Sequence, residues 1–341
     1  MVTIMLSFIV GIMGNSLALG VLYKMRSNHS EMRKSVFYVL VEGLVWTDLL
    51  GILLTAPITI ITYVMYPTKW LCAHPHICKF GAFAGALFGI VTPLIICAMA
   101  IERLFSINYP YTFSVSFTQS KAKLSLIACW GVGLFVASLP LMGFGKYELQ
   151  YPHMWCFLNW HAETPLDTAY ALTYASINVL TMLTLVVSSV TVIVTLLKMR
   201  TYRRSSVGST RQFSILKNPD VAQKQREVEL QMVWFLVGIM FVYVVCWSPL
   251  IIQIIANSTV RTKNYDLDVV AIRLACLNQI LDPWVYILLR RRCVRKIRRV
   301  DMRPRTLQKP KIPVSNHLKD FFMLLPLETA GYPAFTKLSM K

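Results

Sequence analysis

Charged residues are scarce in this chain of 341 residues, and acidic ones are the scarcest. Only 15% of the residues are charged and 55% are apolar, whereas an average soluble domain carries about 25% charge. This composition argues against a soluble globular protein. Acidic residues number 16 against 35 basic ones, giving a formal net charge of +19. Such a charge alone suggests nucleic-acid binding, but a nucleic-acid surface does not need a mostly apolar chain, so we expect no nucleic-acid partner.

Charge is missing altogether from several long stretches. A membrane-spanning helix needs about 20 apolar residues, and six uncharged runs reach that length: 1–23, 49–68, 80–101, 124–145, 168–197 and 230–260. A seventh apolar segment, at about 267–289, contains Arg273 and Asp282. The sequence therefore predicts an all-α membrane protein, a seven-transmembrane helix bundle. We expect its spans at about 1–24, 35–66, 78–105, 122–144, 166–199, 227–258 and 266–289.

A signal peptide carries basic residues before its apolar region. The first run has none before it, and Lys24 and Arg26 follow it instead. We therefore expect the chain to start with a span, with essentially no segment outside the membrane before it.

The basic residues divide unequally when the connections between spans are assigned alternately to two sides. The side that holds the first connection and the C-terminal segment has 29 Lys and Arg and a net charge of +21, and the other side has five and a net charge of 0. By the positive-inside rule the first side is cytoplasmic. We expect a multi-pass plasma membrane protein with an extracellular N-terminus and a cytoplasmic C-terminus.

Residues 290–299 alternate basic side chains with Cys293, Val294 and Ile297. This pattern predicts a short amphipathic eighth helix at about 290–300, lying on anionic membrane lipids. Cys293 is either a palmitoylation site or a plain free thiol. We expect residues 1–300 to form the bundle and 301–341 a disordered cytoplasmic tail.

Histidine is absent from every predicted span. This disfavours an intramembrane metalloprotease, and no nucleophile–base arrangement is visible. We therefore expect no enzyme activity, no cofactor and no metal site. The paired broken spans and internal symmetry that are typical of transporters are also missing.

Ionisable groups within spans cost about 2.5–3.5 kcal/mol each on insertion scales, so each is a functional candidate. Asp48 and Asp282 can share a sodium ion or water molecules, or form interhelical hydrogen bonds. Glu102 and Arg103 form either a switch or an ordinary interfacial pair. Arg273 either extends toward the headgroups or binds an anion, since guanidinium groups suit carboxylates.

Three cysteines, Cys72, Cys78 and Cys156, fall on the predicted outer side. An oxidising environment favours one disulfide there, with one cysteine left over. A bond between Cys78, which opens the third span, and Cys156 would tether the second outer loop over the bundle.

A series of motifs occurs along the chain in a fixed order: Gly14-Asn15, Asp48, Cys78, Glu102-Arg103, Trp130, Cys246-Trp247-Ser248-Pro249 and Asp282-Pro283-Trp284-Val285-Tyr286. This order resembles a rhodopsin-like G-protein-coupled receptor over residues 1–300. The resemblance implies coupling to heterotrimeric G proteins, and binding of arrestin. It also implies roles in activation and coupling for seven residues: Asp48, Glu102, Arg103, Trp247, Pro249, Asp282 and Tyr286.

Two absences narrow the ligand class. Gly85 stands where amine receptors carry an aspartate, and Cys276 stands where opsins carry the retinal lysine. The chain therefore resembles neither group.

Residues 149–157 and 273–290, together with Thr59 and Tyr63, resemble the prostanoid receptors. The resemblance implies a prostaglandin ligand whose carboxylate binds Arg273. It also implies that Thr59, Tyr63 and Trp155 line the pocket. The outer loop, with Trp155 and Phe157, is expected to cover it. The sequence departs from the family pattern at His153-Met154, where Gly-Thr is usual.

Signals for the receptor subtype conflict. Residues 95–103 and 149–160 resemble the prostaglandin E receptor of subtype 4, which stimulates cyclic AMP, whereas residues 246–249 resemble other subtypes. We expect a prostaglandin E receptor with stimulatory coupling. The alternative is a transporter or a non-signalling binding protein for an anionic lipid.

Overall fold

The fold is that of a computed structural model, which describes residues 2–28, 35–65, 70–161, 164–206, 219–260 and 264–301. Two compact units divide the chain, Met1–Ile297 and Arg298–Lys341. The site discussed below belongs to the first unit, as do the helices except for the last four residues of α10. The expected tail lies outside the described residues from 302 onward.

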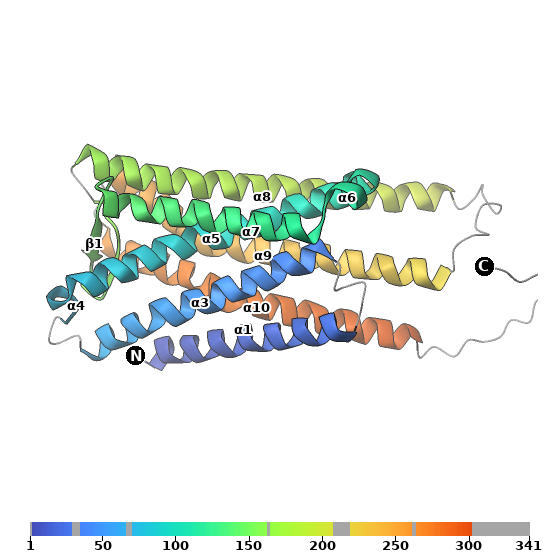
Figure 1. The fold of residues 1–341 in the computed structure, drawn as a ribbon, viewed down its shortest axis with the longest axis horizontal. Helices are drawn as coiled ribbons and strands as arrows, with labels where there is room; N and C mark the ends of the chain where they lie inside the picture. The colour runs from blue at the N-terminus through green and yellow to red at the C-terminus, as the bar shows by residue number, and fades with distance from the viewer. Residues whose placement is uncertain are drawn as a thin grey trace, which may run out of the picture. The chain divides into compact units, whose positions relative to one another are not determined.

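Long helices dominate the described part of the first unit (Figure 1). They are α1 (Val2–Asn28), α3 (Val36–Val64), α5 (Pro75–Asn108), α7 (Gln119–Ser138), α8 (Pro165–Ser206), α9 (Pro219–Thr259) and α10 (Tyr265–Asp301). Shorter pieces connect them: α4 (Trp70–Ala73), α6 (Pro110–Ser116) and the 3-10 helix Leu139–Met142. These helices confirm the expected all-α bundle.

Among the described residues, six helices are long and apolar enough to span a membrane. They are the long helices named above except α10. The seventh span expected at 266–289 lies in α10, which does not meet the same criterion. The polar side chains of Arg273, Asn278, Gln279 and Asp282 lower the hydropathy of that helix. Such residues in a spanning helix usually face the bundle interior rather than lipid.

The helix α5 occupies the centre of the bundle, since it packs against α3, α7, α8 and α9. Most of its side chains from Ala82 to Arg103 are buried. The helix α7, by contrast, exposes large apolar side chains such as Ile127 and Phe135. Exposed apolar surface of this extent on a helix that can span a membrane fits contact with lipid.

A β-hairpin lies at one end of the bundle, beside the start of α5 (Figure 1). Strand β1 (Tyr147–Gln150) pairs antiparallel with β2 (Trp155–Leu158), with Leu149 opposite Cys156. A disulfide joins Cys156 to Cys78 in the first turn of α5, with Cα atoms 5.4 Å apart. The expected tether is thereby confirmed, and Cys72 is the exposed free cysteine left over. We call this the hairpin end and the other the opposite end.

Residues 290–300 are helical, as expected for an eighth helix. They continue α10 without a break, however, so the structure does not separate an eighth helix from the seventh span. The side chain of Cys293 lies outside the described part, so its modification stays a prediction.

The chain that leads into the hairpin packs tightly against α8. Tyr147 donates a hydrogen bond to the carbonyl oxygen of Ala137 (2.7 Å), and burial raises the pKa of its phenol, which keeps this donor protonated. Gly143 and Gly145 both adopt positive φ angles, 93° and 91°. A Cβ atom at Gly145 would also lie 2.6 Å from the Cβ of Tyr170, whereas one at Gly143 would meet nothing within 4 Å.

We predict that Gly145→Ala destabilises the protein more than Gly143→Ala. Both substitutions force alanine into the left-handed region, at about 1–2 kcal/mol, but only Gly145→Ala adds a clash with Tyr170. The apparent thermal unfolding midpoint of detergent-solubilised protein should fall in the order wild type, Gly143→Ala, Gly145→Ala. Equal midpoints for the two variants would contradict this packing.

Candidate ligand-binding site

A cavity of about 680 Å³ opens between the helices at the hairpin end. Side chains of α1, α3, α4, α5, α9 and α10 line it, and Pro152 with residues 154–157 of the hairpin forms part of its wall. Most of the lining is apolar, from residues such as Phe8, Ile52, Phe88 and Leu250. Its size and lining are typical of a pocket for a drug-sized apolar ligand.

Arg273 of α10 lines this cavity, and its Nη2 atom donates a hydrogen bond to the hydroxyl of Tyr63 in α3 (3.0 Å). The guanidinium therefore points across the bundle toward α3. In the described part of the chain it has no acidic partner. An unpaired cation beside apolar walls provides a site for an anionic group.

Three polar side chains of α3, Thr55, Thr59 and Tyr63, form a stripe along the same wall. Their spacing of four residues places them on one face of the helix. Thr55 donates its hydroxyl to the carbonyl of Gly51 (2.7 Å) and Thr59 donates to that of Thr55 (3.2 Å). Their oxygens can therefore still accept hydrogen bonds. The sequence pointed to Thr59 and Tyr63 but missed Thr55, although its position one turn before Thr59 was the available signal.

The hairpin contributes aromatic rings to the cavity wall. Trp155 and Phe157 both line the cavity, with ring centroids 6.2 Å apart. The indole nitrogen of Trp155 donates to the carbonyl of Tyr151 (3.0 Å), so this side chain offers its ring to a ligand rather than its N–H. Met154, one of the departures from the family pattern, lines the cavity as well.

Two glycines of α5 leave room for these rings. A Cβ atom at Gly85 would lie 3.6 Å from the ring of Phe157, and one at Gly89 would lie 2.7 Å from Trp247. The contact at Gly85 would be an ordinary van der Waals one, so Gly85 faces the hairpin without being required for its approach. Gly89, which the sequence did not single out, lets Trp247 approach α5 closely. Cys276 also lines the cavity, three residues after Arg273 and on the same face of α10.

Polar residues meet where the cavity reaches the middle of the bundle. Thr92 and Asn278 line it there. Thr92 donates to Asp48 (3.2 Å) and Asn278 donates to Asp282 (2.9 Å). One oxygen of each acid has no partner in the described part of the chain. The bond from Thr92 of α5 to Asp48 of α3 joins two helices. Both acids are fully buried.

The opposite end contains the pair Glu102–Arg103. Arg103 is 5% exposed and bonds the carboxylate of Glu102 in an ion pair. Its Nη1 atom also lies 3.1 Å from the sulfur of Met232 in α9, and its guanidinium carbon is 4.6 Å from the ring centre of Phe37 in α3. These contacts hold Arg103 between three helices. Tyr286 of α10 packs nearby against Phe235, with ring centroids 5.3 Å apart.

The structure thus brings together all five of the residues expected to bind ligand, Arg273, Thr59, Tyr63, Trp155 and Phe157, around one cavity. The seven residues expected to act in activation do not form one site. Trp247 lies on the cavity wall, and Pro249 follows within the same helix. Asp48 and Asp282 lie in the polar middle of the bundle, and Glu102, Arg103 and Tyr286 lie toward the opposite end.

The fold and these motifs agree with a family comparison. Residues 14–286 match the model described as 7 transmembrane receptor (rhodopsin family). The crystal structure of squid rhodopsin superposes with a TM-score of 0.71 at 15% sequence identity, covering 88% of this chain and 85% of that chain. The chain therefore belongs to the rhodopsin family of seven-transmembrane receptors.

Two similar sequences narrow the group. The chain is 35% identical over 321 residues to the prostaglandin E2 receptor EP4 subtype of Homo sapiens, covering 85% of this chain and 64% of the relative. It is 33% identical over 315 residues to the thromboxane A2 receptor of Homo sapiens, covering 88% of this chain and 86% of the relative. Within its family the chain groups with these prostanoid receptors, which are not enzymes. It spans about 64% of the length of the first relative.

The turn between the two strands carries backbone strain. His153 has a φ of 71°, in the left-handed region, and its N–H donates to the carbonyl of Gln150 (2.7 Å). The prostanoid receptors usually have glycine at this position, and glycine adopts this conformation without a steric penalty. The structure thus gives a physical reason for that preference.

We predict that His153→Gly stabilises the receptor. The relief of about 1–2 kcal/mol of left-handed strain exceeds the roughly 0.5–1 kcal/mol that glycine loses through the entropy of the unfolded chain. Glu148→Gly in β1 is the control: Glu148 is exposed and lies in a regular strand, so glycine should only destabilise there. Apparent thermal midpoints should shift in opposite directions, and a fall for both variants would show that His153 is unstrained.

Proposed function

We propose that this protein is a plasma-membrane G-protein-coupled receptor for a prostanoid, with prostaglandin E as the favoured ligand. The observation that carries the proposal is the guanidinium of Arg273, which has no acidic partner among the described residues and lines a largely apolar cavity. An amphiphile with one carboxylate and long hydrocarbon chains complements both features. The similarity to the prostaglandin E2 and thromboxane A2 receptors supports the same ligand class.

The charge distribution supports an orientation with the hairpin end outside the cell. The predicted connections at the opposite end, with the C-terminal segment, hold most of the 35 Lys and Arg, and positive charge collects on the cytoplasmic side. The disulfide between Cys78 and Cys156 lies at the hairpin end and is favoured in an oxidising environment. Arg103 then faces the compartment that contains G proteins.

In this proposal the ligand's carboxylate pairs with Arg273, and Tyr63 holds the guanidinium in place through its hydroxyl. The oxygens of Thr55 and Thr59 accept hydrogen bonds from the ligand's hydroxyl groups. Its hydrocarbon chains pack on the apolar lining, where each buried CH₂ contributes about 0.8 kcal/mol. The rings of Trp155 and Phe157 exclude water from the hairpin side.

Activation follows from the position of α9 in this arrangement. Trp247 contacts the cavity, and Met232 of the same helix contacts Arg103 at the opposite end. A ligand that binds better when Trp247 moves shifts the population toward that arrangement. Pro249 removes one backbone hydrogen bond of α9 and provides a point where the helix can bend. Displacement of Met232 frees Arg103 to engage the G protein. The surface exposed at the opposite end by this displacement is also available to arrestin.

We predict that Arg273→Ala weakens binding of tritiated prostaglandin E2 by about 30-fold to several thousand-fold, since loss of one partner of a charge pair that the bound ligand shields from water costs about 2–5 kcal/mol. Tyr63→Phe removes only the hydroxyl that orients the guanidinium, so it should weaken binding less than tenfold. Asp266→Asn, which changes an exposed side chain of α10 outside the cavity lining, is the control and should leave the affinity unchanged. Unchanged affinity of Arg273→Ala at normal surface expression would refute the carboxylate site.

The coupling is tested with a panel of prostanoids on cells that express the receptor, with cyclic AMP and calcium recorded together. We expect prostaglandin E to raise cyclic AMP most strongly, and the response to disappear in cells that lack the stimulatory G protein. Uptake of labelled ligand without any G protein would instead indicate a transporter. Binding without a second messenger would indicate a non-signalling binding protein.

A further inference from the structure

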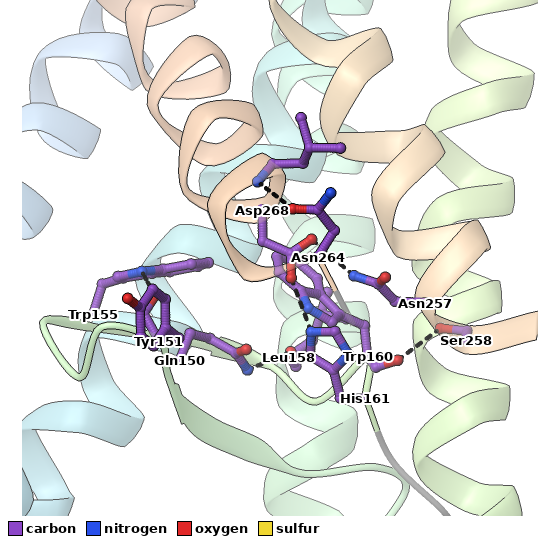
Figure 2. Close-up of polar contacts among 11 residues, drawn as sticks. Gln150, Tyr151, Trp155, Leu158, Trp160, His161, Asn257, Ser258, Asn264 and Asp268 are labelled. Atoms are coloured by element: carbon purple, nitrogen blue, oxygen red, sulfur yellow. Dashed lines mark hydrogen bonds and ion pairs between the residues drawn. The ribbon is translucent and has the colours of Figure 1, made fainter. Parts of the chain in front are cut away.

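A polar network joins the end of the hairpin to two helices (Figure 2). Asp268, in the first turn of α10, accepts hydrogen bonds from Nε2 of His161 (2.9 Å) and from the side-chain amide of Asn257 in α9 (2.8 Å). His161 follows β2 by only three residues. One carboxylate therefore connects three segments that are far apart in the sequence.

The network is built into the protein rather than lying on its surface. Asp268 is 4% exposed and Asn257 is 1% exposed. The first turn of a helix is also the position where a negative side chain is most favourable. A second contact runs in parallel, because Ser258 of α9 bonds the carbonyl oxygen of Trp160 (3.5 Å). Of two consecutive residues after β2, Trp160 thus bonds α9 directly, and His161 bonds Asp268 of α10, which in turn bonds α9.

The rings next to this network reach the cavity. Trp160 is buried, with its ring centroid 5.8 Å from that of Trp155 and 5.6 Å from that of Phe157. Trp155 and Phe157 line the cavity, as do Val269, Ile272 and Arg273, which follow Asp268 in α10. A change at Asp268 or His161 therefore acts on the hairpin wall through packed rings, without either residue lining the cavity.

The disulfide alone does not fix the hairpin. It holds Cys156 to α5, which is one point on one side of the cavity, and a single point still permits rotation about it. Tyr147 also attaches β1 to the carbonyl oxygen of Ala137 at the end of α7. The bonds of His161 and Trp160 attach the residues after β2 to α9 and α10. Together these attachments hold the hairpin across the cavity.

We propose that His161 and Asp268 are positioning residues that keep the hairpin closed over the cavity and thereby set how slowly a ligand leaves. The inference rests on the proposed function for its ligand, but closure itself is a property of the empty protein. Because Asn257 and Ser258 belong to α9, the same bonds link the position of the hairpin to the helix that carries Trp247.

The test compares His161→Ala, which removes the bond to Asp268 and leaves Asn257 in place, with three other variants of the full-length receptor. His161→Gln keeps a side-chain donor. Asp268→Asn keeps the volume of Asp268 and removes its charge. Asp266→Asn changes an exposed carboxylate in the same turn, which has no polar partner in the described part of the chain.

The first measurement needs no ligand. A membrane-impermeant anionic thiosulfonate is applied to cells, and modification of Cys276 on the cavity wall is followed by mass spectrometry. Cys72, exposed and not part of the cavity lining, is the internal reference. We expect Cys276 to react about 3- to 10-fold faster in His161→Ala and Asp268→Asn, the range that loss of one hydrogen bond gives. Wild type, His161→Gln and Asp266→Asn should agree within about twofold.

The second measurement is the dissociation rate of tritiated prostaglandin E2. It should increase about 3- to 10-fold in His161→Ala and Asp268→Asn, with a smaller change in association, since a loosened hairpin mainly eases exit. Unchanged Cys276 modification and unchanged dissociation in both variants would overturn the proposal. If even the wild type fails to bind the prostaglandin, the proposed function fails, while Cys276 modification still decides whether the network closes the cavity.

Discussion

Backbone hydrogen bonding in a medium without water is the constraint on which this structure depends. In hydrocarbon an unpaired N–H or C=O group costs several kcal/mol, so the spans must be helical. Polar side chains within them follow the same rule. Hydroxyl groups bond to the carbonyl four residues earlier at Thr47, Thr55, Thr59, Thr62, Thr173, Thr181, Thr184 and Thr191. Against that background Arg273, whose described partner is a neutral hydroxyl, stands out as a group that is only partly satisfied.

The cavity and the opposite end share the same helices, so packing at one depends on packing at the other. Helix α5 holds Gly89 beside Trp247 and, four turns later, Arg103 beside Met232. Both partners of α5 in these contacts belong to α9. Because packed interiors resist continuous deformation, two such contacts along one pair of helices favour discrete arrangements over gradual ones.

Sequence patterns could predict the spans, because an uncharged apolar run of about 20 residues matches the thickness of a bilayer and is unusual in a soluble domain. They could also place Arg273, Tyr63 and Thr59 near one another through a resemblance of the surrounding motifs.

The hairpin itself was not predicted, since its strands of four residues carry no clear alternation. Contacts between distant segments were missed as well: His161 and Asp268 are 107 residues apart, and neither residue type is unusual in a loop or a first helical turn. The helix expected at about 290–300 is present as the end of α10, and its amphipathic pattern fits either a separate helix or an extended one.

The indole rings at the hairpin end have a spectroscopic consequence. Trp155 and Trp160 lie 5.8 Å apart with their planes tilted by 55°, a fixed chiral arrangement of two strong chromophores. Such a pair gives near-ultraviolet circular dichroism that depends on its geometry. The protein therefore contains its own optical reporter of hairpin position, readable in solution without any attached label.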